Sequence, residues 1–209
     1  MKIFLIILSV ILIVAVVLML FMVISAPKKK DYEHLTAPRI IEKPDVSALI
    51  VPFDGDPNVV LKEAFGDMFK AYYKVKGAPK GPTQLPSVAR YENFDDKLHD
   101  VETMTQEELK SVPWKGFTAI PVPAGSTLPE GAPSSVRLET LSYGTIAEVI
   151  HFGPYDQEKP VIIALKKFIE DEGYEIVGLH EEEYILGPGM PFSKPEKYIT
   201  FIRYQVKRK

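Results

Sequence analysis

The segment HEEEY, residues 180–184, places three consecutive carboxylates inside an otherwise apolar stretch, VGLHEEEYILGP. On a β-strand successive side chains point to opposite faces, so Glu182 and Tyr184 share one face while Glu181 and Glu183 share the other. A carboxylate on a core-facing side is costly unless a partner compensates for its charge. Beside aromatic rings it can hold a flat lipophilic cation, or, with a raised pKa, act as a general base. Glu182 is thus either an exposed strand residue or the floor of a ligand pocket, and we expect Glu181 and Glu183 to be solvated.

Several other kinds of chemistry are excluded or weakly supported by composition. The chain has no cysteine, which excludes a thiol nucleophile and a cysteine-ligated metal. It carries no glycine-rich phosphate loop, nucleophile elbow or H-E-x-x-H pair. The formal net charge of −3 lacks the basic footprint of nucleic-acid binding, so no nucleic-acid partner is expected. No metal or other cofactor is expected, although haem ligation stays open through one of the scattered histidines His34, His99, His151 and His180.

The elements that must position Glu182 are predicted to form two similar halves. The first half, residues 38–122, has predicted strands at 39–42, 46–51, 87–91 and 117–122 and a helix at 57–75. The second half, residues 136–206, has predicted strands at 136–141, 145–152, 177–186 and 198–206 and a helix at 158–172. Arg39, Phe53, Gly77 and Tyr91 recur in the second half as Arg137, Phe152, Gly173 and Tyr184. This order predicts an internal duplication with a ligand cleft between the halves. The acidic segment 95–110 is expected to be an exposed loop with a helical turn.

The first 26 residues differ in character from the rest of the chain. No charged residue occurs in residues 3–26, and the run is nearly all Ile, Leu, Val, Met and Phe. At about 1.5 Å per residue, a helix of this length covers a hydrocarbon core of roughly 30 Å, and it is longer than a signal-peptide core. We predict a single transmembrane helix at 3–26, with the lipid bilayer as a partner, and a short stem at 27–37. The lysine run 28–30 favours a cytoplasmic globular domain.

The second half resembles a known family. The segments TIAEVIHFGPYD and VGLHEEEYILGPG, separated by a helix that ends in EGY, are similar to the GyrI-like domain, the effector-binding domain of AraC- and MerR-type regulators. The resemblance covers about residues 38–207. It implies an α+β fold in which duplicated β-α-β-β (SHS2) modules form a central cleft, here preceded by one transmembrane helix. The membrane helix occupies the place of the family's helix-turn-helix, so we do not expect a transcription factor.

The resemblance also implies which residues bind the ligand. The family's cleft glutamate corresponds to Glu182, with Tyr184 two residues later and with His151 and Tyr155 in the HFGPY turn. Tyr91 holds the place of Tyr184 in the first half, where the glutamate has no counterpart. These five residues form the predicted ligand site.

Three functions are compatible with these residues. The leading expectation is a membrane-anchored protein that binds amphipathic, cationic or aromatic small molecules for sequestration or sensing. The family also includes hydrolases of reactive electrophilic compounds; in that case Glu182 would be the general base, and whether the chain is an enzyme stays open. The third is a protein-interaction domain at the membrane, whose protein partner the sequence does not identify.

Overall fold

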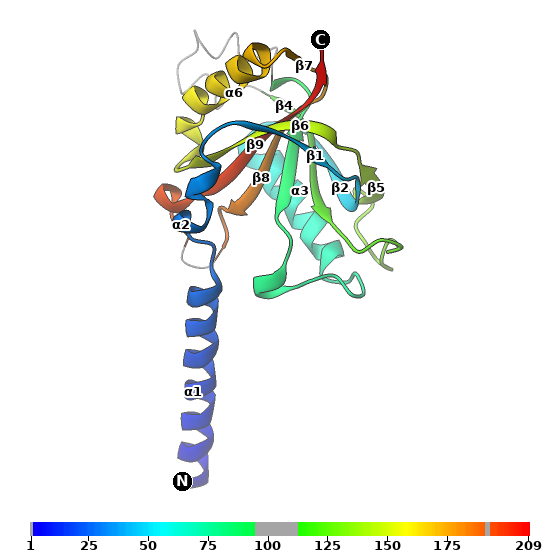
Figure 1. Cartoon of the computed structure of the whole chain (residues 1–209). Coiled ribbons are helices and arrows are strands. Elements are labelled where there is room, and N and C mark those ends of the chain that lie inside the picture. The colour runs from blue at the N-terminus through cyan, green and yellow to red at the C-terminus, as the bar shows by residue number, and fades with distance from the viewer. Residues whose placement is uncertain (1, 95–112, 191–192) are drawn as a thin grey trace.

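The computed structural model describes residues 2–94, 113–190 and 193–209 (Figure 1). The strands are β1 (Arg39–Lys43), β2 (Val46–Gly55), β3 (Ser87–Tyr91), β4 (Trp114–Pro121), β5 (Arg137–Leu141), β6 (Gly144–Phe152), β7 (Tyr174–Ile176), β8 (His180–Leu186) and β9 (Ile199–Arg208). The helices are α1 (Lys2–Ser25), α2 (Lys29–Tyr32), α3 (Pro57–Tyr72) and α6 (Lys159–Asp171), with 3-10 turns η1 (Glu33–Leu35), η2 (Gly81–Thr83), η3 (Tyr155–Gln157) and η4 (Pro195–Lys197). The predicted strands and the two domain helices are present with shifted ends, and the loop predicted at 95–110 lies outside the described residues.

The strands form one antiparallel sheet, curled into a half-barrel, in the order β1-β6-β9-β8-β3-β4-β2-β5, with β7 paired to β9. This order is symmetric about the boundary between β8 and β3. β1 comes from the first half of the sequence but pairs with β6 of the second, and β5 comes from the second half but pairs with β2 of the first. The first strand of each half therefore pairs with the sheet of the other half. The duplication itself stays an inference from the sequence.

One face of the sheet is covered by α3 and α6. The α3 helix packs Met68 and Tyr72 on β2, and the α6 helix packs Leu165 and Ile169 on β6 and β9. Alternation along the strands decides which side chains meet the helices, because every second residue points to the same face. The helix-covered face of β8 presents His180, Glu182 and Tyr184, and that of β2 presents Leu49, Val51 and Phe53.

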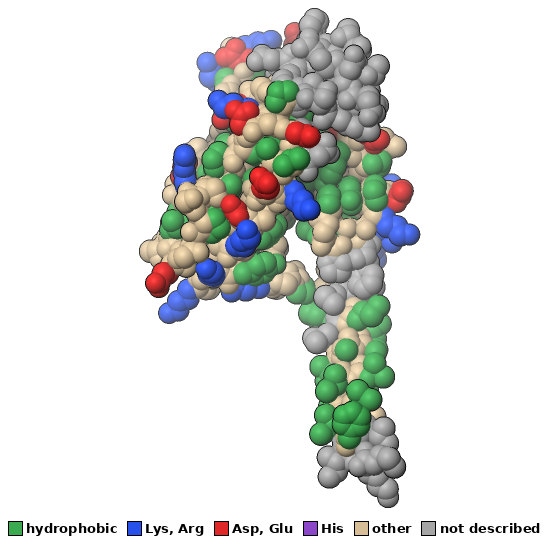
Figure 2. Space-filling view, turned by 180° about the vertical axis from the view of Figure 1, so that it is seen from behind, with side chains coloured by type: hydrophobic (Ala, Val, Ile, Leu, Met, Phe, Trp, Pro, Cys, Tyr) green, Lys and Arg blue, Asp and Glu red, His purple; other side chains and the backbone are tan. Residues whose placement is uncertain are grey.

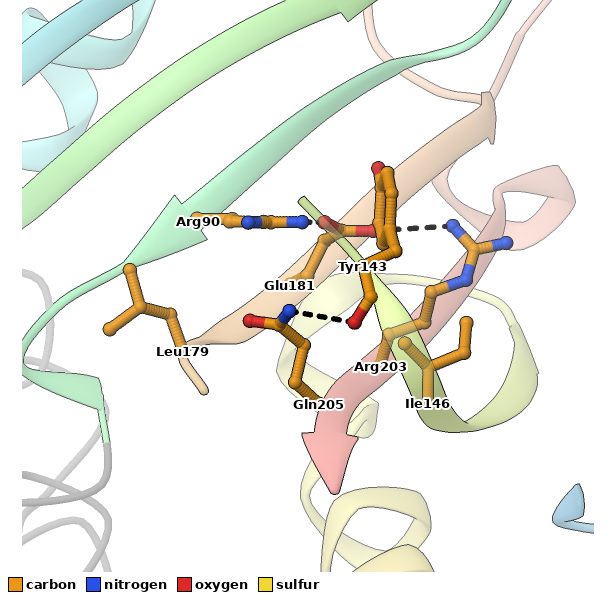
Figure 3. A pocket seen from close by; sticks show the side chains of 7 residues that line it. All are labelled: Arg90, Tyr143, Ile146, Leu179, Glu181, Arg203 and Gln205. Carbon is orange, nitrogen blue, oxygen red and sulfur yellow. Dashed lines mark hydrogen bonds and ion pairs between the residues drawn. The ribbon is translucent and has the colours of Figure 1, made fainter. Parts of the chain in front are cut away.

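The opposite face is enclosed as well, and the prediction that Glu181 and Glu183 are solvated is wrong. Glu181 is 2% exposed, and the Nε of Arg90 donates to its Oε2 at 2.6 Å. Glu183 is half-buried, 2.7 Å from Arg203 and 3.4 Å from Lys43. Figure 3 shows Arg90 and Arg203 approaching Glu181 from two sides around a cavity of about 10 Å³. The curl of the sheet folds the second face inward, so its carboxylates are paired with cations and not with water.

The helix α1 extends away from the domain, with the N-terminus at its far end (Figure 1). Figure 2 shows hydrophobic side chains along its length, and Phe4, Val10 and Ile24 are each more than half exposed. Among the described residues, no helix is found to be long and apolar enough to cross a membrane. The span predicted at residues 3–26 is therefore not supported by the structure.

The predicted stem is docked on the domain. Residues 27–37 include α2 and η1, and the ring of Tyr32 meets the ring of Phe201 edge-on at a centroid distance of 6.4 Å. Leu35 also packs against this cluster, which contains Ile185 and Ile199. The sequence indicates only a polar connector here; the structure shows that two apolar residues within it hold the base of α1 against β8 and β9.

Candidate functional site

Glu182 lies in the middle of the helix-covered face. It pairs with Ala89 of β3 on one side and with Ile202 of β9 on the other, so its immediate neighbours across the sheet are apolar. Its exposed fraction is 8%. A carboxylate in such a place requires hydrogen-bond donors or a cation.

Hydrogen bonds supply part of that requirement. The Tyr184 hydroxyl donates to Oε2 of Glu182 at 2.7 Å, and Nε2 of His180 lies 3.2 Å from Oε1. The series of hydrogen bonds continues beyond both residues. The Tyr91 hydroxyl lies 3.1 Å from that of Tyr184, and the Tyr204 hydroxyl lies 2.9 Å from Nδ1 of His180. Both oxygens of Glu182 therefore have protein partners, in a buried network that joins β3, β8 and β9.

Aromatic rings surround this network. Tyr184 meets Phe65 and Tyr155 edge-on, each at a centroid distance of 5.8 Å. Tyr91 meets Trp114 edge-on at 5.5 Å, which places Trp114 at the site. The ring of Phe94 stacks on His180 at 3.6 Å, almost parallel. Neither Phe65 nor Phe94 is among the ligand residues predicted from the sequence.

Burial fixes the protonation of the tyrosines. Burial, reinforced by the charge of Glu182, raises the pKa of Tyr91 and of Tyr184 well above the ordinary value. The pKa of Tyr155 is raised for the same two reasons. The three phenols are therefore neutral hydrogen-bond donors at physiological pH.

His151 shares the helix-covered face but takes a different partner. Its Nε2 lies 3.1 Å from the carbonyl oxygen of Pro154, in the turn that leads to η3. Burial lowers its pKa, although this hydrogen bond acts in the opposite direction. The structure thus brings Glu182, Tyr184, Tyr155 and Tyr91 into one cluster and places His151 at its edge.

Glu158 is a residue that sequence reasoning missed. It is the N-cap of α6 and is only 3% exposed. Burial and then the charge of Glu182 raise its pKa to about 10, so the side chain is a neutral acid at physiological pH. In the sequence it looks like any acidic residue at a helix start; its only signal is its position three residues after Tyr155.

Glu182 lines neither of the cavities found in the described part of the structure. The two cavities that we describe lie elsewhere, one beside Arg90 and Arg203 (Figure 3) and the other, of about 340 Å³, between Lys74 and Pro129. Among the described residues no group of His, Asp or Glu side chains is arranged to hold a metal ion.

The same fold is found in other solved structures. An uncharacterised conserved protein from Listeria innocua has a TM-score of 0.66 and 20% identity, over 86% of this chain and 96% of that one. A hydrolase from Listeria innocua has a TM-score of 0.63 and 19% identity, over 86% and 98%. The EcmrR C-terminal domain has a TM-score of 0.58 and 17% identity, over 83% and 98%. The predicted α+β fold is thereby confirmed.

EcmrR is also matched within its complex with DNA, where the match covers 61% of the EcmrR chain at a TM-score of 0.57. No protein-family model and no curated protein matches the sequence. The similarity extends to the fold, and the arguments about the site rest on this chain's own residues.

Proposed function

We propose that this chain binds amphipathic, cationic or aromatic small molecules at Glu182, and that α1 anchors it in a membrane. One observation carries the first part: a carboxylate 8% exposed, between apolar neighbours, is surrounded by aromatic rings of Tyr184, Tyr155 and Phe65. A flat lipophilic cation satisfies both features, because its charge pairs with the carboxylate while the rings contribute stacking and cation–π attraction of about 0.5–2 kcal/mol each.

A binding measurement with the full chain in lipid nanodiscs tests this part. Tetraphenylphosphonium serves as the probe, and isothermal titration calorimetry gives its affinity. We expect Glu182→Gln to weaken binding by at least about tenfold, or roughly 1.4 kcal/mol, because the charge pair is lost while the shape is kept. Glu175→Gln is the matched control, since Glu175 lies on β7 and pairs at the surface with Lys207. Equal affinity in the wild type and Glu182→Gln would remove Glu182 from the site.

The second part of the proposal rests on the character of α1. A helix that is hydrophobic on all sides is stable only when a bilayer or another protein covers it. Exposed apolar side chains follow one another along α1, from Phe4 to Ile24. We expect the chain to stay with membranes during alkaline carbonate extraction. Release into the supernatant would favour a protein partner for α1 and would contradict anchoring.

Hydrolysis is a second candidate function. A hydrogen-bonded carboxylate that lies beside neutral phenols provides a base and an acid in one site. Glu182 would take a proton from the water that bonds to a ring carbon of an epoxide, and Tyr184 would give its proton to the oxygen of the C–O bond that breaks. The proton on Glu182 would then pass to Tyr184 through their hydrogen bond. One of the similar structures is described as a hydrolase. Ring opening of styrene oxide by the wild type, lost in Glu182→Gln, would distinguish turnover from binding alone.

A further inference from the structure

Three buried side-chain oxygens near Glu182 have no hydrogen-bond partner among the described residues. They are the hydroxyl of Tyr155, Oε1 of Glu158 and Oγ1 of Thr200. Thr200 is fully buried and Glu158 is 3% exposed. A buried polar group without a partner costs about 1–3 kcal/mol, so three in one region call for an explanation.

The three unpaired oxygens belong to one part of the site. Thr200 on β9 lies directly opposite Tyr184 on β8 and opposite His151 on β6, so its side chain is on the helix-covered face between them. The Tyr155 ring contacts the Tyr184 ring from the turn above. A Cβ at residue 187 would lie 3.0 Å from the Tyr155 hydroxyl, and Gly187 leaves room for that oxygen.

Glu158 approaches the same region from the start of α6. Although it is the N-cap, its side chain makes no capping hydrogen bond. It is electrostatically coupled instead to groups on three other elements: Glu182 on β8, Tyr91 on β3 and Tyr155 in η3. The carboxyl group therefore lies within electrostatic range of the site and does not cap the helix that it precedes.

We propose that Glu158, together with the unpaired hydroxyls of Tyr155 and Thr200, is a second recognition point in the site, which receives an N–H-bearing cationic group such as an amidinium, guanidinium or primary ammonium. This inference rests on the proposed function. Glu182 is already bonded on both oxygens by Tyr184 and His180, whereas the three unpaired oxygens are free to accept N–H groups. A quaternary or phosphonium centre has no N–H to offer them. The favoured ligands are thus aromatic molecules with two cationic ends, one for each carboxylate.

Occupation of this point is coupled to the release of a proton. With a pKa of about 10, Glu158 holds its proton at neutral pH in the unliganded protein. A cation beside it stabilises the carboxylate and lowers that pKa, so the proton leaves to the solvent as the ligand binds. The affinity for such a ligand consequently rises with pH between the pKa of Glu158 in the ligand-bound protein and its pKa in the free protein.

Calorimetry on the full chain in nanodiscs tests the inference with two probes. One is 4′,6-diamidino-2-phenylindole, which carries two amidinium groups, and the other is tetraphenylphosphonium, which has no N–H. Titrations at neutral pH in phosphate and in Tris, whose ionisation enthalpies differ, count the protons released. We expect the diamidine to release about one proton and the phosphonium less than about half of one.

Glu158→Gln, which keeps the shape of the neutral acid, should abolish proton release and weaken the diamidine about tenfold or more. It should change phosphonium affinity less than about threefold, a difference below roughly 0.7 kcal/mol. Thr200→Val is a second variant that removes one unpaired oxygen; it should weaken the diamidine while keeping or raising the melting temperature.

The outcomes separate the inference from the proposed function. If Glu182→Gln weakens both probes while Glu158→Gln and Thr200→Val leave the diamidine unchanged, the proposed function stands and the second recognition point is overturned. Equal weakening of both probes by Glu158→Gln, or an unchanged proton count, also overturns it. If the wild type binds neither probe, both are overturned.

Discussion

Replacement of Arg203 by methionine removes the cation at the centre of the enclosed second face. Its guanidinium lies 2.6 Å from Glu148, 2.7 Å from Glu183 and 3.4 Å from Glu181, and the side chain is 6% exposed. Methionine fills similar volume with no charge. The variant therefore leaves three carboxylates in a buried region with less compensation than before.

The loss of stability depends on which cationic partners the three carboxylates retain in the variant. Breaking a buried ion pair from one side costs about 3–5 kcal/mol. Glu148 keeps Arg39, Glu181 keeps Arg90 and Glu183 keeps Lys43, so the lower end of that range applies. For a domain of this size, about 3 kcal/mol corresponds to a fall in melting temperature of roughly 6–12 °C.

The pH dependence gives a sharper test. Burial alone would raise the pKa of Glu183, but Arg203 and Lys43 more than offset it, and the pKa lies below its ordinary value. In the wild type this carboxylate therefore contributes stability that is present above the unfolded-state pKa and lost as pH falls through the folded-state pKa. Without Arg203 its pKa rises, so the variant is most destabilised at neutral pH and recovers relative to the wild type as the carboxylates take up protons.

Thermal unfolding of the full chain in mild detergent, from about pH 7.5 to about pH 5, measures both effects. Arg39→Met is the control: Arg39 pairs with Glu148 alone, and its side chain is 41% exposed, so its loss should cost at most about 1 kcal/mol. The reasoning is refuted if Arg203→Met melts within the range of the control, or if its deficit stays constant or grows as the pH falls.

Two further predictions concern the sheet and the stem. Gly116→Ala should destabilise the domain by about 1–3 kcal/mol or more in urea unfolding, because a Cβ there would lie 1.9 Å from the carbonyl oxygen of Arg90; wild-type stability would contradict the close approach of β3 and β4. Tyr32→Ala removes the contact with Phe201, so limited trypsin digestion should cut the lysine run 28–30 several times faster. An unchanged rate would mean that Tyr32 does not hold the stem.

Strand alternation and the repeated pattern predicted which side chains of β3 and β8 share a face, whereas the choice of Glu182, Tyr155 and His151 as ligand residues came from the resemblance and stays a prediction. The two-residue period separated Glu182 from Glu181 and Glu183 without any knowledge of the fold. The repeat placed Tyr91 and Tyr184 at equivalent positions, and their hydroxyls lie 3.1 Å apart across the symmetric boundary of the sheet. Local pattern suffices here because β8 and β3 are central strands that pair directly with each other.

What the sequence did not predict depends on contacts between distant segments. Glu181 is buried and Glu183 half-buried on a face that the curled sheet encloses, and strand period says nothing about curvature. Glu158 is buried at the start of α6, within electrostatic range of Glu182 on β8, whereas an acidic residue at a helix start is normally solvated. Tyr32 packs on Phe201, 169 positions later, and no local signal marks that contact.

The exchange of β1 and β5 between the halves makes the domain comparable to a strand-swapped dimer whose two subunits are joined in one chain. In a dimer the two subunits would associate in an equilibrium that depends on protein concentration. Here the segment 123–135 joins the two halves covalently, so each half experiences a fixed effective concentration of the other, about millimolar for a short flexible link. Neither half can complete its own sheet, because its outer strand is supplied by the other. Two polypeptides divided within that segment would therefore be complementary fragments, each folding only in the presence of its counterpart.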